Sequence, residues 1–182
     1  MIKNIYLKSL PPIIVIIISI IWFFDDNKGK LLKNISNINN NYNHEVRAVF
    51  KAIDGDSLRM SNGQEIRLLK IDAPEYKQKC FDKDNREYHC GKVSSKFLRK
   101  LVKNRELNCK YQKKDIYDRY LAICYDGDKN INHEMVKNGM AIIYNIHDAG
   151  DELKLLEKTA RANKIGLWQG KFLTPREFRR MR

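Results

Sequence analysis

The feature that most limits the fold of this chain is a series of short strand-like runs separated by turn signals. The runs are rich in β-branched and aromatic residues and occupy residues 45–53, 57–60, 64–71, 105–112 and 119–126. An Asn-Gly pair at residues 62–63 predicts a hairpin between the second and third runs. A parallel sheet of βαβ units would need a helix after each strand, and this order does not supply one. Short strands with turn signals indicate a small closed barrel instead.

Helical periodicity appears in three places. Apolar residues recur on one stripe of residues 92–103, namely Val93, Phe97, Leu98, Leu101 and Val102. Residues 132–139 form a shorter candidate helix, residues 140–144 a last short strand, and residues 151–166 a final helix. Five strands with a helix after the third fit an oligonucleotide-binding (OB) barrel. We therefore predict an α+β fold, an OB-fold five-stranded barrel with about three helices.

The charge of the chain points to a polyanionic partner. The 182 residues carry 35 Lys and Arg against 22 Asp and Glu, a net charge of +13. Five of these basic and two of these acidic residues precede residue 45, so the remainder keeps an excess of about ten positive charges. A basic domain suits nucleic acid first and an anionic membrane second, although solubility alone also explains such charge.

The N-terminus has the layout of an export signal. An uncharged apolar run covers residues 10–24, with Lys3 and Lys8 before it and Asp25 and Asp26 after it. Its length suits a signal-peptide core, yet no small-x-small cleavage motif follows. We expect an uncleaved single-pass anchor in residues 1–24 with the domain outside the cytoplasm, periplasmic or at the cell surface, or a secreted protein if the segment is cleaved.

The remaining chain divides by composition. Residues 25–44 are Asn-rich without a clear period, which predicts a flexible tether. The folded domain is expected in residues 45–170, followed by a basic C-terminal tail in residues 171–182. Nothing in the sequence indicates a protein partner, and we expect a monomer.

The four cysteines have no zinc-site spacing. They stand at residues 80, 90, 109 and 124, without a C-x-x-C pair. In an exported chain an even number favours disulfides. Cys80 and Cys90 bracket a polar loop, and Cys109 and Cys124 lie in successive strand-like runs, which predicts those two pairs. Four free buried thiols in a cytoplasmic protein are the alternative.

Three acidic clusters lie at the ends of predicted strands. They are Asp54-Gly55-Asp56, the run "RLLKIDAPE" from Arg67 to Glu75, and "DIYDR" from Asp115 to Arg119. Each alone is explained by a turn or a solvated strand end. An EF-hand loop starting at Asp54 is excluded, because Arg59 stands at the sixth position, where the sharp turn needs Gly.

Together the clusters indicate chemistry on phosphate. Carboxylates brought close together repel one another unless a cation lies between them, and hard oxygen ligands suit Ca²⁺ or Mg²⁺. Guanidinium groups bind phosphate oxygens through a planar fork. A divalent ion, a further carboxylate and two arginines are the components of phosphodiester hydrolysis, as Lewis acid, general base and charge stabiliser.

The motifs "AIDGDSLRM", "IRLLKIDAPE", "DIYDRYLAICY", "HEMVKNGMA" and "EKTARANKIGLW", in this order, resemble the staphylococcal nuclease (thermonuclease) family from about Val46 to Trp168. That family has an OB-fold barrel with three helices and cleaves DNA and RNA with Ca²⁺. The resemblance implies that Asp56 and Asp72 bind one calcium ion through their carboxylates, and Ala73 through its main-chain carbonyl.

The same resemblance implies the catalytic roles. Glu75 matches the general base, Arg67 and Arg119 match the two phosphate-binding arginines, and Tyr117 matches a tyrosine near the bound nucleotide. The chain departs from the family at Asp118, where many relatives have Gly, a residue that adopts φ > 0 without strain. A second departure is Tyr144, which stands alone where reference members carry two tyrosines.

The sequence therefore predicts a calcium-dependent nuclease that hydrolyses DNA, RNA or both with low sequence specificity. No base-reading helix is visible. The alternative is a non-catalytic OB-fold module that binds nucleic acid. A membrane-surface adaptor explains the anchor but leaves the acid and arginine clusters unexplained.

Overall fold

The computed structural model describes residues 42–181. The predicted anchor in residues 1–24 and nearly all of the predicted tether in residues 25–44 lie outside the described residues, as does Arg182. Between residues 42 and 181, no helix combines the length and the apolarity that crossing a membrane requires.

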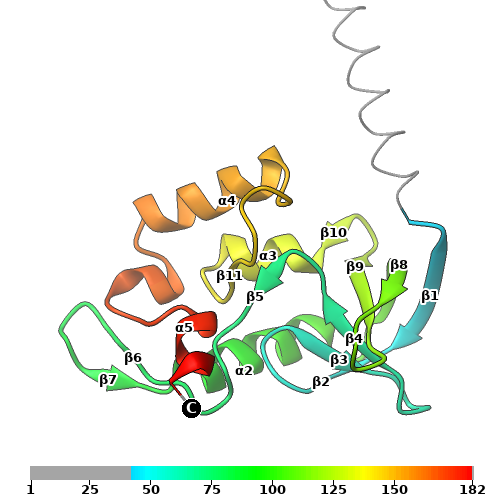
Figure 1. Cartoon of the computed structure of the whole chain (residues 1–182), viewed down its shortest axis with the longest axis horizontal. Helices are drawn as coiled ribbons and strands as arrows, with labels where there is room; N and C mark the ends of the chain where they lie inside the picture. Colours follow the sequence, from blue (N-terminus) through cyan, green and yellow to red (C-terminus); the bar gives the residue numbers. More distant parts are fainter. Residues whose placement is uncertain (1–41, 182) are drawn as a thin grey trace, which may run out of the picture. The chain divides into compact units, whose positions relative to one another are not determined.

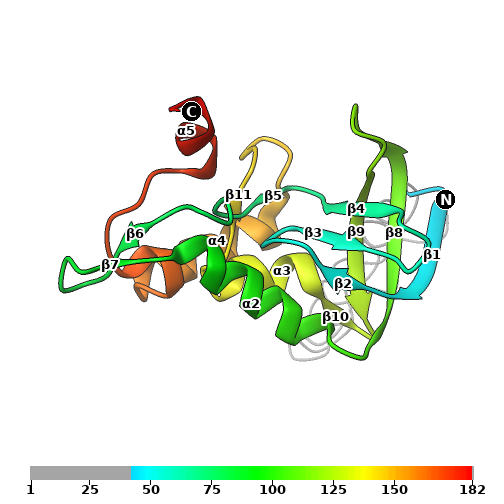
Figure 2. The ribbon, with the colours of Figure 1, turned by 90° about the horizontal axis from the view of Figure 1, so that it is seen from below.

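A mixed sheet forms one end of the domain. Its strands run in the order β1-β8-β9-β4-β3-β2, with β10 added beside β9 (Figures 1 and 2). They are β1 (His44–Val49), β2 (Lys51–Ala52), β3 (Ser57–Arg59), β4 (Glu65–Leu68), β8 (Glu106–Lys114), β9 (Tyr120–Asp126) and β10 (Lys129–Asn130). Only the β4–β9 pair is parallel among the described strands. The two edge strands β1 and β2 are separated in the chain by the buried Phe50 alone, so the sheet curls until its edges are neighbours, as an OB-like fold requires.

Two predicted strands are broken in the structure. The run 45–53 bends at Phe50, which divides it into β1 and β2. The run 64–71 breaks because Lys70 takes a φ of 71°, which turns the chain out of the main sheet. The following strand β5 (Ile71–Asp72) pairs instead with β11 (Ile142–Ile143). This bend carries Asp72 away from the main sheet.

Four α-helices lie in the described part of the chain, one more than predicted. They are α2 (Cys90–Val102), α3 (Ile131–Lys137), α4 (Asp151–Ala162) and α5 (Pro175–Arg180), with a 3₁₀-helix η2 (Gly166–Gln169) after α4. The additional helix α5 lies in the segment predicted as a basic tail, and a capping box between Thr174 and Glu177 with Pro at the first turn begins it. In Figure 2 α2 and α3 lie next to the main sheet, and α5 lies farthest from it.

The core forms between the sheet and α2 and α3. Leu58, Ile66 and Leu107 from the sheet are fully buried, together with Leu98 of α2. Of the predicted apolar stripe, Leu98 and Val102 are buried and Phe97 and Leu101 pack partly buried against the core, whereas Val93 is exposed. Gly91, Ser94 and Ser95 form the buried face at the start of α2, because the segments that contain Gly55 and Glu75 pack closely against it.

Both predicted disulfides are confirmed. Cys80 is bonded to Cys90 and Cys109 to Cys124, and the described residues contain no free cysteine. The first bond joins the hairpin of β6 (Cys80–Phe81) and β7 (Glu87–Tyr88) to the start of α2. The second links the neighbouring strands β8 and β9 at directly opposed positions.

Candidate active site

Two chain segments bring the predicted metal-binding carboxylates together. Asp56 directly precedes β3, and Asp72 ends β5. The N–H of Ala73 donates to Oδ2 of Asp56 at 2.6 Å, and the N–H of Leu68 donates to the carbonyl of Asp56 at 2.8 Å. Gly55 permits this close approach, because a Cβ there would collide with Ser94 of α2 and with the Ala73 side chain. Asp56 and Asp72 are both buried, and the backbone N–H of Ala73 holds the Asp56 carboxylate in place.

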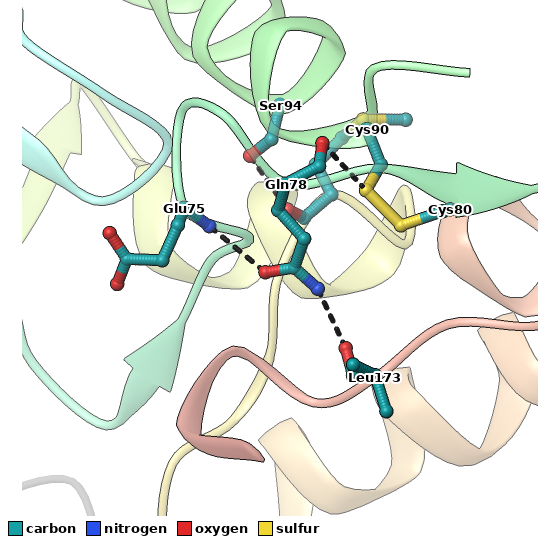
Figure 3. Close-up of a disulfide and its surroundings, with 7 residues drawn as sticks. Glu75, Gln78, Cys80, Cys90, Ser94 and Leu173 are labelled. Atoms are coloured by element: carbon teal, nitrogen blue, oxygen red, sulfur yellow. Dashed lines mark hydrogen bonds between the residues drawn. A yellow bond between two sulfur atoms is a disulfide. The ribbon is translucent and has the colours of Figure 1, made fainter. Parts of the chain in front are cut away.

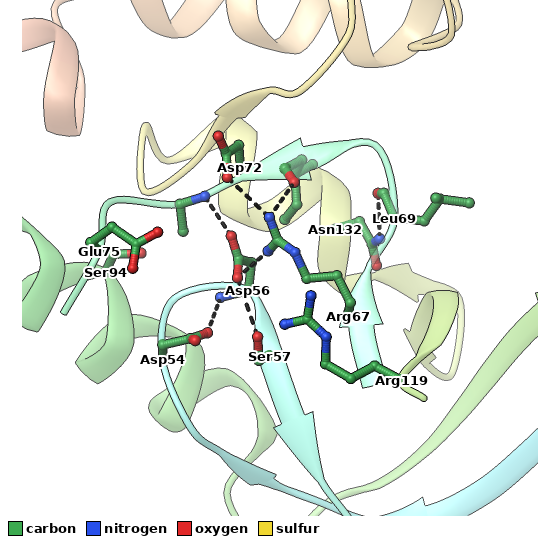
Figure 4. Close-up of polar contacts among 12 residues, drawn as sticks. Asp54, Asp56, Ser57, Arg67, Leu69, Asp72, Glu75, Ser94, Arg119 and Asn132 are labelled. Carbon is green, nitrogen blue, oxygen red and sulfur yellow. Dashed lines mark hydrogen bonds and ion pairs between the residues drawn. The ribbon is translucent and has the colours of Figure 1, made fainter. Parts of the chain in front are cut away.

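Arg67 lies between these two carboxylates. Its guanidinium forms an ion pair with Oδ1 of Asp56 and donates to Oδ1 of Asp72 at 3.0 Å (Figure 4). Only 15% of the Arg67 side chain is exposed. Burial lowers the pKa of Arg67, and the charge of Asp72 works in the opposite direction. Arg67 therefore pairs with two carboxylates at once and is held by both.

Glu75 lies on the loop between β5 and β6 and is positioned through its backbone. Its N–H donates to Oε1 of Gln78 at 3.1 Å, and its carbonyl lies so close to Gly91 of α2 that a Cβ there would overlap it. The Glu75 carboxylate itself is about one third exposed, and it points away from Gln78 and the Cys80–Cys90 bond (Figure 3). A carboxylate on a fixed backbone with access to solvent is suited to accepting a proton from water.

Arg119 approaches the same site from the loop between β8 and β9. Its Nε donates to Oδ2 of Asp115 at 2.9 Å. Figure 4 shows the Arg119 guanidinium near that of Arg67. Burial raises the pKa of Asp115, but hydrogen bonds from Arg119 and from backbone N–H groups outweigh this and lower the pKa overall. Asp115 is therefore a charged partner that orients Arg119.

The departure at Asp118 has a clear local structure. Asp118 takes a φ of 63°, so this turn does use the backbone conformation that favours Gly. Its carboxylate accepts from Nζ of Lys114 at 2.8 Å, which raises the pKa of Lys114. Because Asp118 pairs with Lys114, its charge is directed away from Arg119.

One cavity of about 520 Å³ connects these residues. Its lining includes Asp54, Asp56, Arg67, Glu75, Asp115, Tyr117, Arg119, Tyr144 and Arg179. Tyr117 and Tyr144 are exposed at this cavity, and the Arg119 guanidinium lies 5.4 Å from the Tyr117 ring centre. Anionic groups, cationic groups and exposed aromatic rings thus share one opening, which suits a ligand with phosphates and bases.

One site residue was missed by sequence reasoning. Arg179 of α5 places its guanidinium on Asp72, with distances of 3.1 Å to Oδ1 and 3.0 Å to Oδ2, and on Oε1 of Glu75 at 2.9 Å. The hydrogen bonds to Asp72 and Glu75 raise the pKa of Arg179. The run Thr174-Pro-Arg-Glu177 is a helix-start signal that predicts α5, but no sequence pattern indicates that Arg179 reaches the acidic loops.

The donor set fits a hard divalent cation. Asp56, Asp72 and Glu75 offer only oxygen, and the guanidiniums of Arg67 and Arg179 leave one of these three negative charges uncompensated. Within residues 42–181, no three His, Cys, Asp or Glu side chains form a cluster that could hold a metal by themselves. The predicted set of two carboxylates and the Ala73 carbonyl is smaller than such a cluster, and its role as a ligand set stays a prediction.

Comparison with known proteins identifies the family of this chain. Residues 65–170 match the family model described as "Staphylococcal nuclease homologue". The chain is 37% identical over 124 residues to an uncharacterized endonuclease of Haemophilus influenzae, covering 66% of this chain and 64% of that protein. It is 33% identical over 124 residues to an uncharacterized endonuclease of Escherichia coli O157:H7, covering 66% and 74%. It is 30% identical over 119 residues to succinoglycan biosynthesis protein ExoI of Rhizobium meliloti, covering 64% and 61%.

The fold and the cavity define an α+β protein with an OB-like sheet and a pocket of acids and arginines. The chain belongs to the staphylococcal nuclease family, because the family model matches more than half of its length. It spans less than two thirds of the length of two of the relatives named above.

Proposed function

We propose that this protein is a calcium-dependent nuclease that hydrolyses phosphodiester bonds of DNA, RNA or both with low sequence specificity. The observation that carries the proposal is the convergence of Asp56, Glu75, Arg67 and Arg119 on one cavity, with Asp72 directly behind it on the Arg67 guanidinium. Relatives named endonucleases and a family that is generally calcium-dependent support it.

Asp56, Asp72 and the carbonyl of Ala73 would hold the calcium ion. Such an ion supplies Lewis acidity that polarises a phosphate oxygen. The chain itself supplies the remaining chemistry. Glu75, which is reachable by solvent, accepts the proton of the attacking water, while its fixed backbone keeps the carboxylate at one place.

The arginines stabilise the charge that grows on the phosphate. The contacts of Arg67 with Asp56, Asp72 and the carbonyl of Ile71 use three of its five N–H donors, which leaves donors for a phosphate at the cavity. Arg119 is oriented by Asp115 and faces the same cavity. Tyr117 offers an exposed ring on which a base or sugar packs.

The test uses the full chain with plasmid DNA and with RNA. Ca²⁺ should support cleavage, and an excess of chelator should abolish it. Asp72→Asn should weaken both metal binding and cleavage, because it removes one formal charge from the site. Asp128→Asn, at an exposed turn, is the matched control and should leave both unchanged.

Binding without cleavage would favour the alternative function. If the chain retains nucleic acid on a filter or gel and cleaves nothing with Ca²⁺, it is a non-catalytic OB-fold binding module. Cleavage that is as fast in excess chelator as with Ca²⁺ would contradict the calcium site, although the protein would still be a nuclease.

We also propose that the domain is held outside the cytoplasm by the segment 1–24. Two observations support this: the charge layout of the N-terminus and the two disulfides, which form in oxidising compartments. Protease added to intact cells should digest the domain, whereas protection equal to that of a cytoplasmic control would refute the proposal.

A further inference from the structure

The contact of Arg179 joins the C-terminal helix α5 to the acidic segment that contains Asp72 and Glu75. Its guanidinium faces both oxygens of Asp72 as a fork and shares one nitrogen with Glu75. These residues are separated by more than one hundred positions in the sequence. The pairing is therefore a product of the tertiary fold and of where the C-terminal segment lies.

The C-terminal segment is anchored before it reaches the site. The N–H of Phe81 donates to the carbonyl of Lys171 at 2.8 Å. Nε2 of Gln78, a fully buried residue, donates to the carbonyl of Leu173 at 2.7 Å (Figure 3). The same Gln78 side chain accepts from the N–H of Glu75, so one residue fixes both the loop of Glu75 and the segment that leads to α5.

The start of α5 is also specified. Thr174 caps the helix by accepting from the N–H of Glu177, and the Glu177 carboxylate returns to the N–H of Thr174. Pro175 is buried at the first turn. One helical turn after Pro175, Arg179 faces Asp72 and Glu75. The capping residues therefore fix where α5 begins and thus the side of the helix on which Arg179 lies.

Asp72 is covered by its two arginines. Its side chain is only 2% exposed, and it does not line the cavity, although Asp56 and Glu75 do. Oδ1 of Asp72 accepts from Arg67 and from Arg179, and Oδ2 accepts from Arg179. A cation that approaches Asp72 from the cavity therefore meets the Arg179 guanidinium at the same oxygens.

We propose that Arg179 is a resident cation of this site, and that Arg179 and the divalent metal ion are alternative partners of Asp72 and Glu75. The inference rests on the proposed function, because it takes Asp72 as a metal ligand. A guanidinium and a divalent ion on the same two oxygens would repel each other strongly at such short distances. Binding of the metal at Asp72 thus requires Arg179 to withdraw, and the position of α5 sets the affinity for the metal.

Arg179 is able to withdraw, whereas Arg67 is not. The Arg179 side chain is 39% exposed and belongs to a helix of six residues at the end of the described chain. Arg67 is 15% exposed and lies on a strand paired on both sides. Of the two arginines on Asp72, the C-terminal one is the exchangeable partner.

The test is calcium titration calorimetry on the full chain and on Arg179→Ala. Removal of the competing guanidinium should tighten Ca²⁺ binding about tenfold, as expected if roughly nine molecules in ten hold Arg179 on Asp72 without metal. Arg179→Lys keeps the charge but loses the fork, and should give an intermediate affinity. Arg176→Ala, an exposed arginine of the same helix, makes the same change in net charge and should alter the affinity less than twofold.

A second measurement separates competition from a general effect on folding. Arg179 should stabilise only the metal-free protein. The melting temperature of Arg179→Ala should therefore be lower than that of the unmodified chain without metal, and the difference should shrink at saturating Ca²⁺. A purely structural role would lower both melting temperatures equally.

The outcomes distinguish this inference from the proposed function. If the unmodified chain binds Ca²⁺ and Arg179→Ala binds it equally or more weakly, Arg179 does not compete, and the inference is overturned while the calcium site stands. If neither protein binds Ca²⁺, the calcium site itself is wrong and the inference fails with it. Binding by Arg179→Ala alone would support the inference most strongly.

Discussion

The two arginines assigned to phosphate are held in different ways. Arg67 is fixed by tertiary contacts on the acid side of the cavity, defined here as Asp56, Arg67 and Asp72, where three separate segments meet. Arg119 is fixed by a local contact on the loop side, residues 115–119, where its partner Asp115 lies four positions away. Its neighbour Tyr117 is largely exposed.

This difference separates stability from activity. On the acid side, a substitution leaves a buried charge without its partner, which destabilises the fold as well as the site. On the loop side, the pair is local and somewhat more exposed, with 25% of the Arg119 side chain and 16% of the Asp115 side chain accessible, so its loss should cost less stability. We therefore expect changes on the acid side to affect both folding and function, and changes on the loop side to affect mainly function.

The largest effect is expected for Asp72→Ala. It removes the shared partner of Arg67 and Arg179, and should lower the free energy of unfolding by about 3 kcal/mol, the low end for a broken buried pair because Arg179 is partly exposed. Urea unfolding of the full chain measures this, and nuclease activity should be lost. The control Asp128→Ala, at an exposed turn, should change stability by less than about 0.5 kcal/mol. Equal effects of the two substitutions would contradict the role of the acid side in stability.

The second prediction concerns catalysis without a change in fold. Glu75→Gln keeps the size of the side chain and should lower turnover by about 10²–10⁴, the usual range for a general base. Affinity for nucleic acid should stay the same or rise slightly, because one anion leaves the cavity. Single-turnover cleavage and a binding titration separate the two quantities. Glu87→Gln, an exposed carboxylate on β7, is the matched control, and a fall in affinity with unchanged turnover would contradict the role of Glu75.

The third prediction tests the loop side directly. Arg119→Ala should lower turnover by about 10²–10³, as for one preorganised donor to the transition state. Its stability should change by no more than about 1 kcal/mol, because the pair with Asp115 is local and partly solvated. Arg105→Ala removes another arginine that pairs with a single aspartate, and should leave turnover unchanged. A loss of stability as large as that of Asp72→Ala would show that the loop side is also part of the folding core.

Sequence patterns predicted the elements that have a period, and missed those that depend on single backbone angles. The strands of the main sheet, the three longer helices and both disulfide pairs follow from alternation, helical spacing and the positions of the cysteines. The break after β4 depends on the φ of Lys70, a residue type that gives no signal for such a turn. The exposed Val93 follows from close packing of loops on α2, which periodicity alone does not contain.

The candidate site shows the same division. Arg67 contacts both Asp56 and Asp72, and Arg67, Asp56, Glu75 and Arg119 line the same cavity. The roles of these residues, and those of Ala73 and Tyr117, stay predictions. Arg179 was outside the reach of the sequence, because its importance arises from where α5 docks and not from a local pattern.

The smallest effect is expected for Asp118→Gly, which replaces the residue that departs from the family. Glycine adopts the φ of 63° without strain, but it costs about 0.5–1 kcal/mol of additional chain entropy and loses an exposed ion pair with Lys114. The relief of backbone strain opposes the entropy cost and the loss of the ion pair, so the free energy of unfolding should change by less than about 0.5 kcal/mol. Because the Asp118 carboxylate is directed to Lys114 and not to Arg119, turnover should also stay within about a factor of three. A steady-state assay beside Asp118→Asn, which keeps the side-chain size without the charge, provides the check. If both variants raise turnover tenfold or more, the Asp118 charge acts on Arg119 after all, and the loop side would be electrostatically coupled in the way that the acid side is.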